Sequence, residues 1–179
     1  KAVLWEPSGE SSKVQCKLCS WRCVIDDGKL GRCCVRQNIS GVLYSLNYDK
    51  LCSANPDPIE KKPLFHFQPG SQSFSIATMG CNFQCEFCQN WQISQAAVED
   101  GRIDGQSISP DWIIESAIQS KCKSIAYTYT EPTVFMELCN DCGRLAKEHL
   151  LSLLRIPQRP HGAAALRHSH RTLQAYALL

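Results

Sequence analysis

Three cysteines packed into eight residues constrain this chain more than any other feature of its sequence. They stand at C-x3-C-x2-C spacing and are here called the loop cysteines: Cys81, Cys85 and Cys88. Thiols this close cannot all pair with one another as disulfides, but they can converge on one iron–sulfur cluster. A cubane cluster has four irons, so three ligands leave one iron open to a substrate, as a catalytic zinc keeps one open position. The spacing therefore predicts a [4Fe–4S] site that binds something; three reduced cysteines on a loop are the alternative.

A second group of cysteines lies near the N-terminus, in two turns separated by Asp26-Asp27-Gly28 and Gly31. Two such turns can hold one metal, and four residues, here called the N-terminal cysteines, form the predicted ligand set: Cys16, Cys19, Cys23 and Cys33. A closed tetrahedral zinc site is the default for four cysteines. A second iron–sulfur cluster is the rival, and thiols without a ligand are the third possibility. Cys34 is not included in the predicted ligand set.

The composition bounds the location and the partners. Twelve cysteines in 179 residues are too sparse for a disulfide scaffold. No signal-peptide pattern and no apolar run of about 18 residues is present. We therefore expect a reducing, cytoplasmic location and no membrane contact. The formal net charge of +2 gives no evidence of nucleic-acid binding.

The middle of the chain predicts an α/β fold. Residues 73–78 and 124–130 have strand composition, and residues 110–120 and 133–147 have helical periodicity. This alternation is typical of parallel α/β proteins. The loop cysteines follow the first strand directly, at the end where α/β folds place their active sites. Cys139 and Cys142 are expected in the core rather than on a metal.

Three regions follow from this pattern. Residues 1–56 form an N-terminal cysteine-rich module, and residues 57–148 form the α/β core. Residues 55–67 contain three prolines and are expected to be an extended linker. Residues 149–179 contain four arginines and no acidic residue, and we expect this basic tail to be disordered or mis-translated.

The loop cysteines, with Phe87 before the last of them, resemble the signature of the radical S-adenosylmethionine (radical SAM) superfamily. The resemblance extends over residues 14–148 and is strongest to the AmmeMemoRadiSam-system radical SAM family, which is related to pyruvate formate-lyase activating enzymes. The matching text is the N-terminal cysteine block, Asp57-Pro58-Ile59-Glu60-Lys61-Lys62-Pro63-Leu64, Gly80-Cys81-Asn82, Phe87-Cys88-Gln89-Asn90-Trp91, and Tyr127-Thr128-Tyr129-Thr130-Glu131-Pro132-Thr133.

This resemblance implies a partial (β/α) barrel that binds a [4Fe–4S] cluster and S-adenosylmethionine (SAM). One electron, expected from a flavodoxin or ferredoxin, would cleave SAM to methionine and a 5′-deoxyadenosyl radical, for protein modification or glycyl-radical activation. Phe87 would pack near the adenine. Thr128, Thr130 and Glu131 lie where many relatives carry a Gly-Gly-Glu segment that takes the SAM amino group. Those glycines are absent here, so Glu131 is either that contact, counted as catalytic, or an acid that caps the next helix.

Two strand–helix units are fewer than the six usual in such a barrel. We therefore expect a truncated or frame-altered member of the family. Two alternatives to a radical SAM enzyme remain: a non-catalytic iron–sulfur or zinc protein, and an inactive fragment. The substrate is not indicated by any residue of the sequence.

Overall fold

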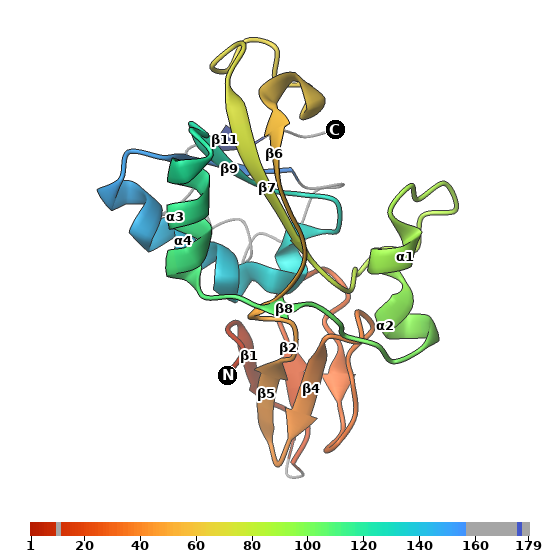
Figure 1. The fold of residues 1–179 in the computed structure, drawn as a ribbon. Coiled ribbons are helices and arrows are strands. Elements are labelled where there is room, and N and C mark those ends of the chain that lie inside the picture. Colours follow the sequence, from red (N-terminus) through yellow and green to blue (C-terminus); the bar gives the residue numbers. More distant parts are fainter. Residues whose placement is uncertain (10–11, 157–174, 177–179) are drawn as a thin grey trace.

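A six-stranded sheet forms the centre of the computed structural model, which describes residues 1–9, 12–156 and 175–176 (Figure 1). The strand order is β11-β10-β9-β7-β6-β8. The four strands from β11 to β7 are parallel, and β6 and β8 extend the sheet as antiparallel strands. The strands are β6 (Lys50–Pro58), β7 (Gln72–Thr78), β8 (Gln106–Ser107), β9 (Ser124–Tyr127), β10 (Ser152–Arg155) and β11 (Ala175–Tyr176).

The N-terminal residues form a separate set of small antiparallel sheets at one end of the central sheet (Figure 1). One sheet has three strands and the other is a hairpin: β1 (Trp5–Pro7), β2 (Val14–Cys16) and β3 (Val24–Ile25), then β4 (Arg36–Ile39) and β5 (Val42–Ser45). Their own core includes Val14, Ile25 and Leu43, and it also contains Met136 from the α/β core. The two predicted modules therefore share buried surface.

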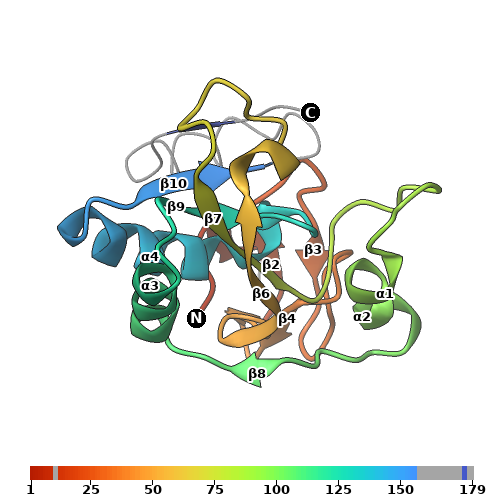
Figure 2. The same ribbon diagram turned by 45° about the horizontal axis from the view of Figure 1, so that its top comes forward.

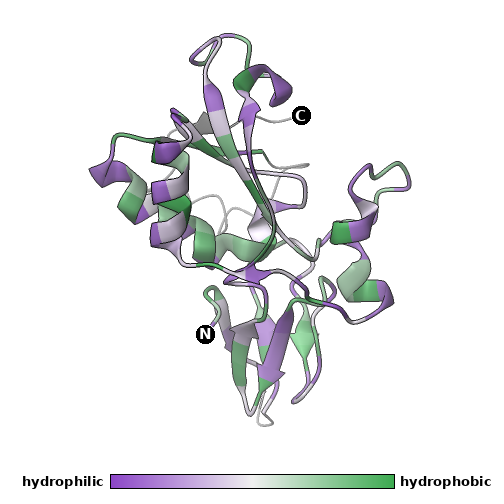
Figure 3. Cartoon of the chain, in the orientation of Figure 1, coloured by the Kyte–Doolittle hydropathy of each residue, from purple (hydrophilic) through white to green (hydrophobic). Residues whose placement is uncertain are grey.

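Two amphipathic helices, α3 (Pro110–Gln119) and α4 (Met136–Glu148), pack together beside the sheet. Figure 3 shows polar and apolar residues alternating along both of them. Ser109 caps α3 as expected, because its side chain accepts a hydrogen bond from the backbone N–H of Trp112. A short 3-10 helix, η2 (Pro132–Phe135), precedes α4, and another, η1 (Ile59–Lys61), follows β6.

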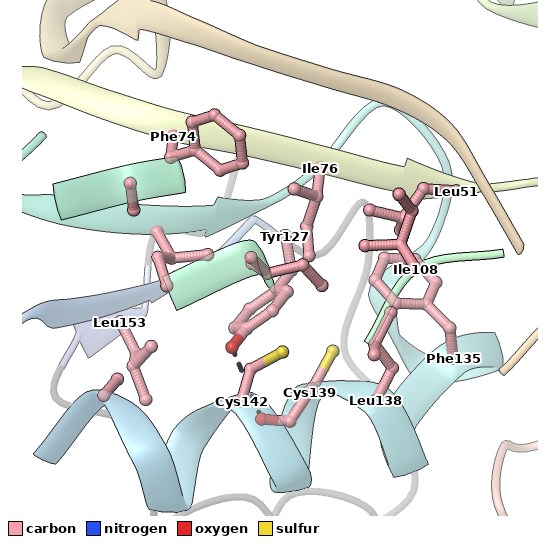
Figure 4. Close-up of a cluster of buried hydrophobic side chains, with 14 of the residues drawn as sticks. Leu51, Phe74, Ile76, Ile108, Tyr127, Phe135, Leu138, Cys139, Cys142 and Leu153 are labelled. Atoms are coloured by element: carbon pink, nitrogen blue, oxygen red, sulfur yellow. Dashed lines mark hydrogen bonds between the residues drawn. The ribbon is translucent and has the colours of Figure 1, made fainter. Parts of the chain in front are cut away.

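The core between α4 and the sheet confirms the prediction for Cys139 and Cys142. Both side chains are buried, and Figure 4 shows them directed toward the sheet beside Tyr127. The hydroxyl of Tyr127 donates to the carbonyl oxygen of Cys139 at 3.4 Å. Burial in this apolar layer raises the pKa of the Cys142 thiol to about 12, so it packs as a neutral side chain.

The expected linker at residues 55–67 is wrong for its first part. β6 runs through Pro58, across the boundary predicted between residues 56 and 57, and pairs along its length with β7. The prolines fit because β8 pairs only with Lys50 and Leu51 at the start of β6. β8 does not extend to Pro56 or Pro58, so the backbone N–H that each proline lacks is not needed for pairing on that side of β6.

The expected disorder from residue 149 is wrong for residues 152–155 and 175–176, which form strands β10 and β11. Residues 152–155 form β10, a third parallel strand after β7 and β9, and all four are buried. A parallel strand that is covered on both faces has apolar residues on both, so its sequence does not alternate between apolar and polar residues. The adjacent Leu153 and Leu154 follow this rule. His161, His168 and the other residues from 157 to 174 lie outside the described residues.

The described sheet is open rather than closed into a barrel. Figure 2 shows helices α1 (Trp91–Ser94) and α2 (Ala96–Glu99) apart from α3 and α4, with β6 and β7 between the two pairs. No helix in the part of the chain that the structure describes is both long enough and apolar enough to cross a membrane.

Candidate functional site

The loop that carries the loop cysteines leaves β7 through a glycine that no other residue could replace without strain. Gly80 has φ +93°, in the left-handed region. A Cβ at this position would lie 2.3 Å from Cγ1 of Val35 in the N-terminal module. The backbone N–H of Gly80 donates to the carbonyl oxygen of Ile93 at 3.0 Å, which closes the loop on α1. The turn expected after β7 is therefore present and is packed against the N-terminal module.

All three loop cysteines line one cavity of about 570 Å³ together with residues 128–131 at the end of β9. Cys81 is buried, Cys88 is half-buried and Cys85 is exposed. The side-chain amide of Asn90 donates to the carbonyl oxygen of Tyr129 at 3.1 Å and so joins the loop to the end of β9. The residues predicted from the two strand ends are thus neighbours in space.

The loop is held by bonds among its own residues. The N–H of Cys88 donates to the carbonyl oxygen of Cys85 at 3.1 Å, and the side chain of Gln95 donates to the carbonyl oxygen of Phe83 at 2.9 Å. Burial raises the pKa of the Cys81 thiol to about 11, although the backbone N–H groups of Phe83 and Glu131 oppose the rise. The thiol must therefore lose a proton when it ligates a metal.

Tyr129 adopts the backbone conformation of a glycine. Its φ is +67°, and a residue of this size in the left-handed region is rare and costs about 1–2 kcal/mol. The conformation is held by the side chain, whose hydroxyl donates to Oδ2 of Asp57. A tyrosine therefore adopts, two residues before Glu131, a left-handed conformation that is usual for glycine, and no pattern in the sequence pointed to this residue.

Asp57 connects Tyr129 to two lysines. Its two carboxylate oxygens each lie 2.8 Å from an ammonium nitrogen, Oδ1 from Lys61 and Oδ2 from Lys62. Burial would raise the pKa of the Asp57 carboxyl, but the hydrogen bonds from Lys61, Lys62 and Tyr129 outweigh it and hold the pKa below its ordinary range. Lys62 is buried, and its Nζ lies 4.8 Å from the centre of the Tyr129 ring. Lys62 also lines the same cavity as the loop cysteines. The signal that could have identified this cluster is an aspartate followed, four and five residues later, by two adjacent lysines.

Glu131 lines the cavity and also caps η2. It is fully buried, and its Oε1 accepts hydrogen bonds from the backbone N–H and the hydroxyl of Thr133, at 3.2 and 2.6 Å. Nη2 of Arg155, also buried, lies 3.6 Å from the same oxygen. The capping role that was one of the two expectations for Glu131 is therefore confirmed.

The other predicted cavity residues differ in exposure. Thr130 is buried, and its hydroxyl donates to the carbonyl oxygen of Thr78 at 3.0 Å, which ties the ends of β7 and β9 together. Thr128 is also buried and lines the cavity. Phe87 lines the cavity and is 87% exposed, so its expected contact with adenine stays a prediction.

The N-terminal cysteines line a second, much smaller cavity of about 20 Å³. Cys16 ends β2 and Cys23 immediately precedes β3, and the N–H of Cys16 donates to the carbonyl oxygen of Cys23 at 2.9 Å. Cys33 is buried in the next turn, and burial raises the pKa of its thiol to about 12. The four residues chosen from the sequence are therefore brought together; Cys34 does not line this cavity.

The two cysteine groups are linked by direct contacts. The indole N–H of Trp21 donates to the carbonyl oxygen of Asn82 at 2.9 Å. The guanidinium of Arg32 lies 3.7 Å above the Trp21 ring and donates to Oε1 of Gln84 at 3.5 Å. Within the described residues, no three metal-ligating side chains stand in a coordinating arrangement, so both metal sites stay predictions.

Comparison with known proteins finds one relevant similarity. The chain is 48% identical over 140 residues to the uncharacterized protein MJ0808 of Methanocaldococcus jannaschii. The match covers 78% of this chain and 41% of that protein, so the chain spans about two fifths of the length of the curated relative it matches. No family model matches the chain, and no solved structure matches it.

Proposed function

We propose that the chain is part of a radical SAM protein, in which the loop cysteines hold a [4Fe–4S] cluster and the adjoining cavity holds SAM. One observation carries the proposal: three thiols at C-x3-C-x2-C spacing line a single cavity with the end of the neighbouring parallel strand. The carboxyl ends of parallel strands are where α/β folds bind ligands. A volume of about 570 Å³ is also within the ordinary range for small-molecule sites.

The donor set fits such a cluster. Among the described residues no fourth cysteine lines this cavity, so three thiolates would leave one iron free for a ligand. When bound and reduced, the cluster would supply the electron that cleaves SAM to methionine and a 5′-deoxyadenosyl radical. We propose a flavodoxin or ferredoxin as the electron donor and a protein as one candidate substrate. A reducing cytoplasm suits the twelve free cysteines.

The residues of the chain bind and orient the ligand in this proposal. The cavity wall carries one buried cation, Lys62, and one buried anion, Glu131. Lys62 is paired with Asp57, and Glu131 lies 3.6 Å from Arg155; in this proposal the two groups also contact the carboxylate and the ammonium of the methionine part of SAM. Tyr129 fixes the turn between them, and Phe87 at the rim would pack against the adenine.

The test is anaerobic purification and cluster reconstitution, followed by dithionite and SAM, with detection of 5′-deoxyadenosine by mass spectrometry. The expected result is iron and sulfide in the protein and 5′-deoxyadenosine in the reaction. Cys85→Ser should lose both. Cys34→Ser is the matched control, because Cys34 is half-buried yet lines neither cysteine cavity, and it should keep both. Protein that holds no iron after reconstitution would reject the cluster.

A non-catalytic iron–sulfur protein is the second candidate function. It is favoured by the open edge of the described sheet, since a radical needs an enclosing site that excludes water. The two candidates differ in whether SAM contacts the cluster. SAM should change the EPR signal of the reduced cluster if the first is right, and should leave it unchanged if the second is right.

A further inference from the structure

The N-terminal cysteines are presented by two neighbouring turns. In the first turn, the N–H of Arg22 donates to the carbonyl oxygen of Cys19 at 3.3 Å, between the paired Cys16 and Cys23. In the second, the N–H of Gly31 donates to the carbonyl oxygen of Arg36 at 2.8 Å, around Cys33. A Cβ on Gly31 would lie 3.9 Å from Cβ of Cys23, so the two turns lie close to each other.

The cavity between the turns has room for one ion. It measures about 20 Å³, close to the space that a single water molecule needs. Leu18, Ile25 and Val134 form apolar walls around it. A four-iron cubane is several times larger than this space, so the size of the cavity favours a single metal ion over a second cluster.

Arg36 provides an independent sign that anionic sulfur belongs in this cavity. Its side chain is 1% exposed and lines the cavity. Nη2 donates to both carboxylate oxygens of Glu137, at 2.8 and 2.6 Å, while Nε and Nη1 have no hydrogen-bond partner among the residues that the structure describes. A buried donor without an acceptor costs about 1–3 kcal/mol. Cys16 and Cys33 line the same cavity as Arg36; they are neutral as thiols but become strong acceptors as thiolates.

We propose that the N-terminal cysteines bind one zinc ion as a closed tetrathiolate site, with Arg36 as a positioning residue that donates N–H groups to the bound sulfurs. Each thiol releases its proton to solvent on binding, so one Zn²⁺ replaces four protons. The resulting centre carries two negative charges, which the buried guanidinium partly balances. Cys19 and Cys23 are half-buried, and closing the site requires their thiols to turn toward Cys16 and Cys33.

The proposal is tested by metal analysis of the protein purified anaerobically without added metal. The expected result is one zinc per chain. Cys19→Ser and Cys33→Ser should each lose it. Cys34→Ser and Cys85→Ser should keep it, so a failure of the proposed radical SAM function would leave this result unchanged. Zinc that survives both of the first two substitutions, or iron in place of zinc, would overturn the proposal.

Cobalt substitution gives a second readout that does not depend on any variant. Co²⁺ added to the zinc-free protein should produce the sulfur-to-metal charge-transfer and visible bands of a tetrahedral tetrathiolate, and one equivalent of Zn²⁺ should remove them. Octahedral cobalt spectra would contradict the site. Arg36→Lys keeps the charge but loses the donors directed at the sulfurs, and it should weaken zinc binding about 10- to 100-fold. Unchanged zinc affinity would reject the role of Arg36.

Discussion

The indole N–H of Trp21 donates to the carbonyl oxygen of Asn82 at 2.9 Å, across 61 residues of sequence. Trp21 lies in the first turn of the N-terminal cysteines, and Asn82 follows the first loop cysteine. Asn82 is buried while Trp21 is half exposed, so the bond lies at the edge of the packed contact between the two cysteine groups. The geometry of one cysteine group therefore depends on the other.

Trp21→Phe should loosen the loop cysteines while leaving the N-terminal module folded. The variant removes the donor but keeps an aromatic ring under Arg32, and losing one such hydrogen bond costs about 1 kcal/mol. We expect faster amide hydrogen exchange in residues 81–88, measured by mass spectrometry. The matched control is Trp5→Phe, which breaks an indole bond to Ala2 within the module. Equal exchange of residues 81–88 in both variants would contradict the link.

Glu131→Gln should separate ligand binding from capping. The amide oxygen can still cap η2, but the charge that would hold the ammonium of SAM is lost. A charge-assisted bond of about 1.5–3 kcal/mol corresponds to at least a tenfold rise in the dissociation constant of SAM. Equilibrium dialysis with labelled SAM on the reconstituted protein measures this rise. Thr133→Val removes the hydroxyl that donates to the Glu131 carboxylate. It should disturb the cap but have a much smaller effect on the dissociation constant of SAM. Similar affinities in the two variants would assign Glu131 a capping role only.

Asp57→Asn should destabilise the fold and make its stability depend less on pH in the acid range. Lys62 would lose its buried counter-ion, which costs about 3 kcal/mol. In the unchanged protein the folded pKa of Asp57 lies below its ordinary value of 3.8, so the unfolded state binds more protons between the two pKa values. Stability is therefore fully present above 3.8 and is lost as the pH falls toward the folded pKa.

Urea unfolding from pH 7 down to pH 2 measures both effects of Asp57→Asn. Asp26→Asn is the control, because Asp26 pairs with Lys13 at 2.8 Å on the exposed surface and should contribute less than about 1 kcal/mol. An acid slope that is equally steep in Asp57→Asn and in the unchanged protein would show that other carboxyl groups dominate.

Local patterns in the sequence were enough to predict that the loop cysteines lie close together and that a helix follows Ser109. The spacing of the loop cysteines lies within eight residues, and the cap of α3 involves residues three apart. Asp57 and Tyr129 are 72 residues apart, and a single sequence has no periodicity that reports such a contact. The positive φ of Tyr129 was equally hidden. A tertiary contact of its side chain stabilises the turn, whereas tyrosine as a residue type does not favour this conformation.

The two errors in the fold have a common physical cause. Proline content suggested a linker at residues 55–67, and charge suggested disorder from residue 149, but strand pairing decided residues 55–58 and 152–155. Pro56 lies opposite Phe74 in β6, and Leu153 lies opposite Ile125 in β10. Pairing partners far away in the sequence stabilised these strands, and tertiary context commonly overrides local preference in this way.

Gly80→Ala should test how tightly the loop is packed on the N-terminal module. A Cβ there would adopt an unfavourable φ and lie 2.3 Å from Val35, so we expect a loss of about 2–4 kcal/mol in the free energy of unfolding. Gly70→Ala is the control, because φ at Gly70 is +72° and no described atom would lie within 4 Å of its new Cβ, so it carries the backbone strain alone. In a double-mutant cycle, Val35→Ala should recover the part of the loss that exceeds the Gly70 value. Equal losses for Gly70→Ala and Gly80→Ala would show that the loop can move away from Val35 without cost.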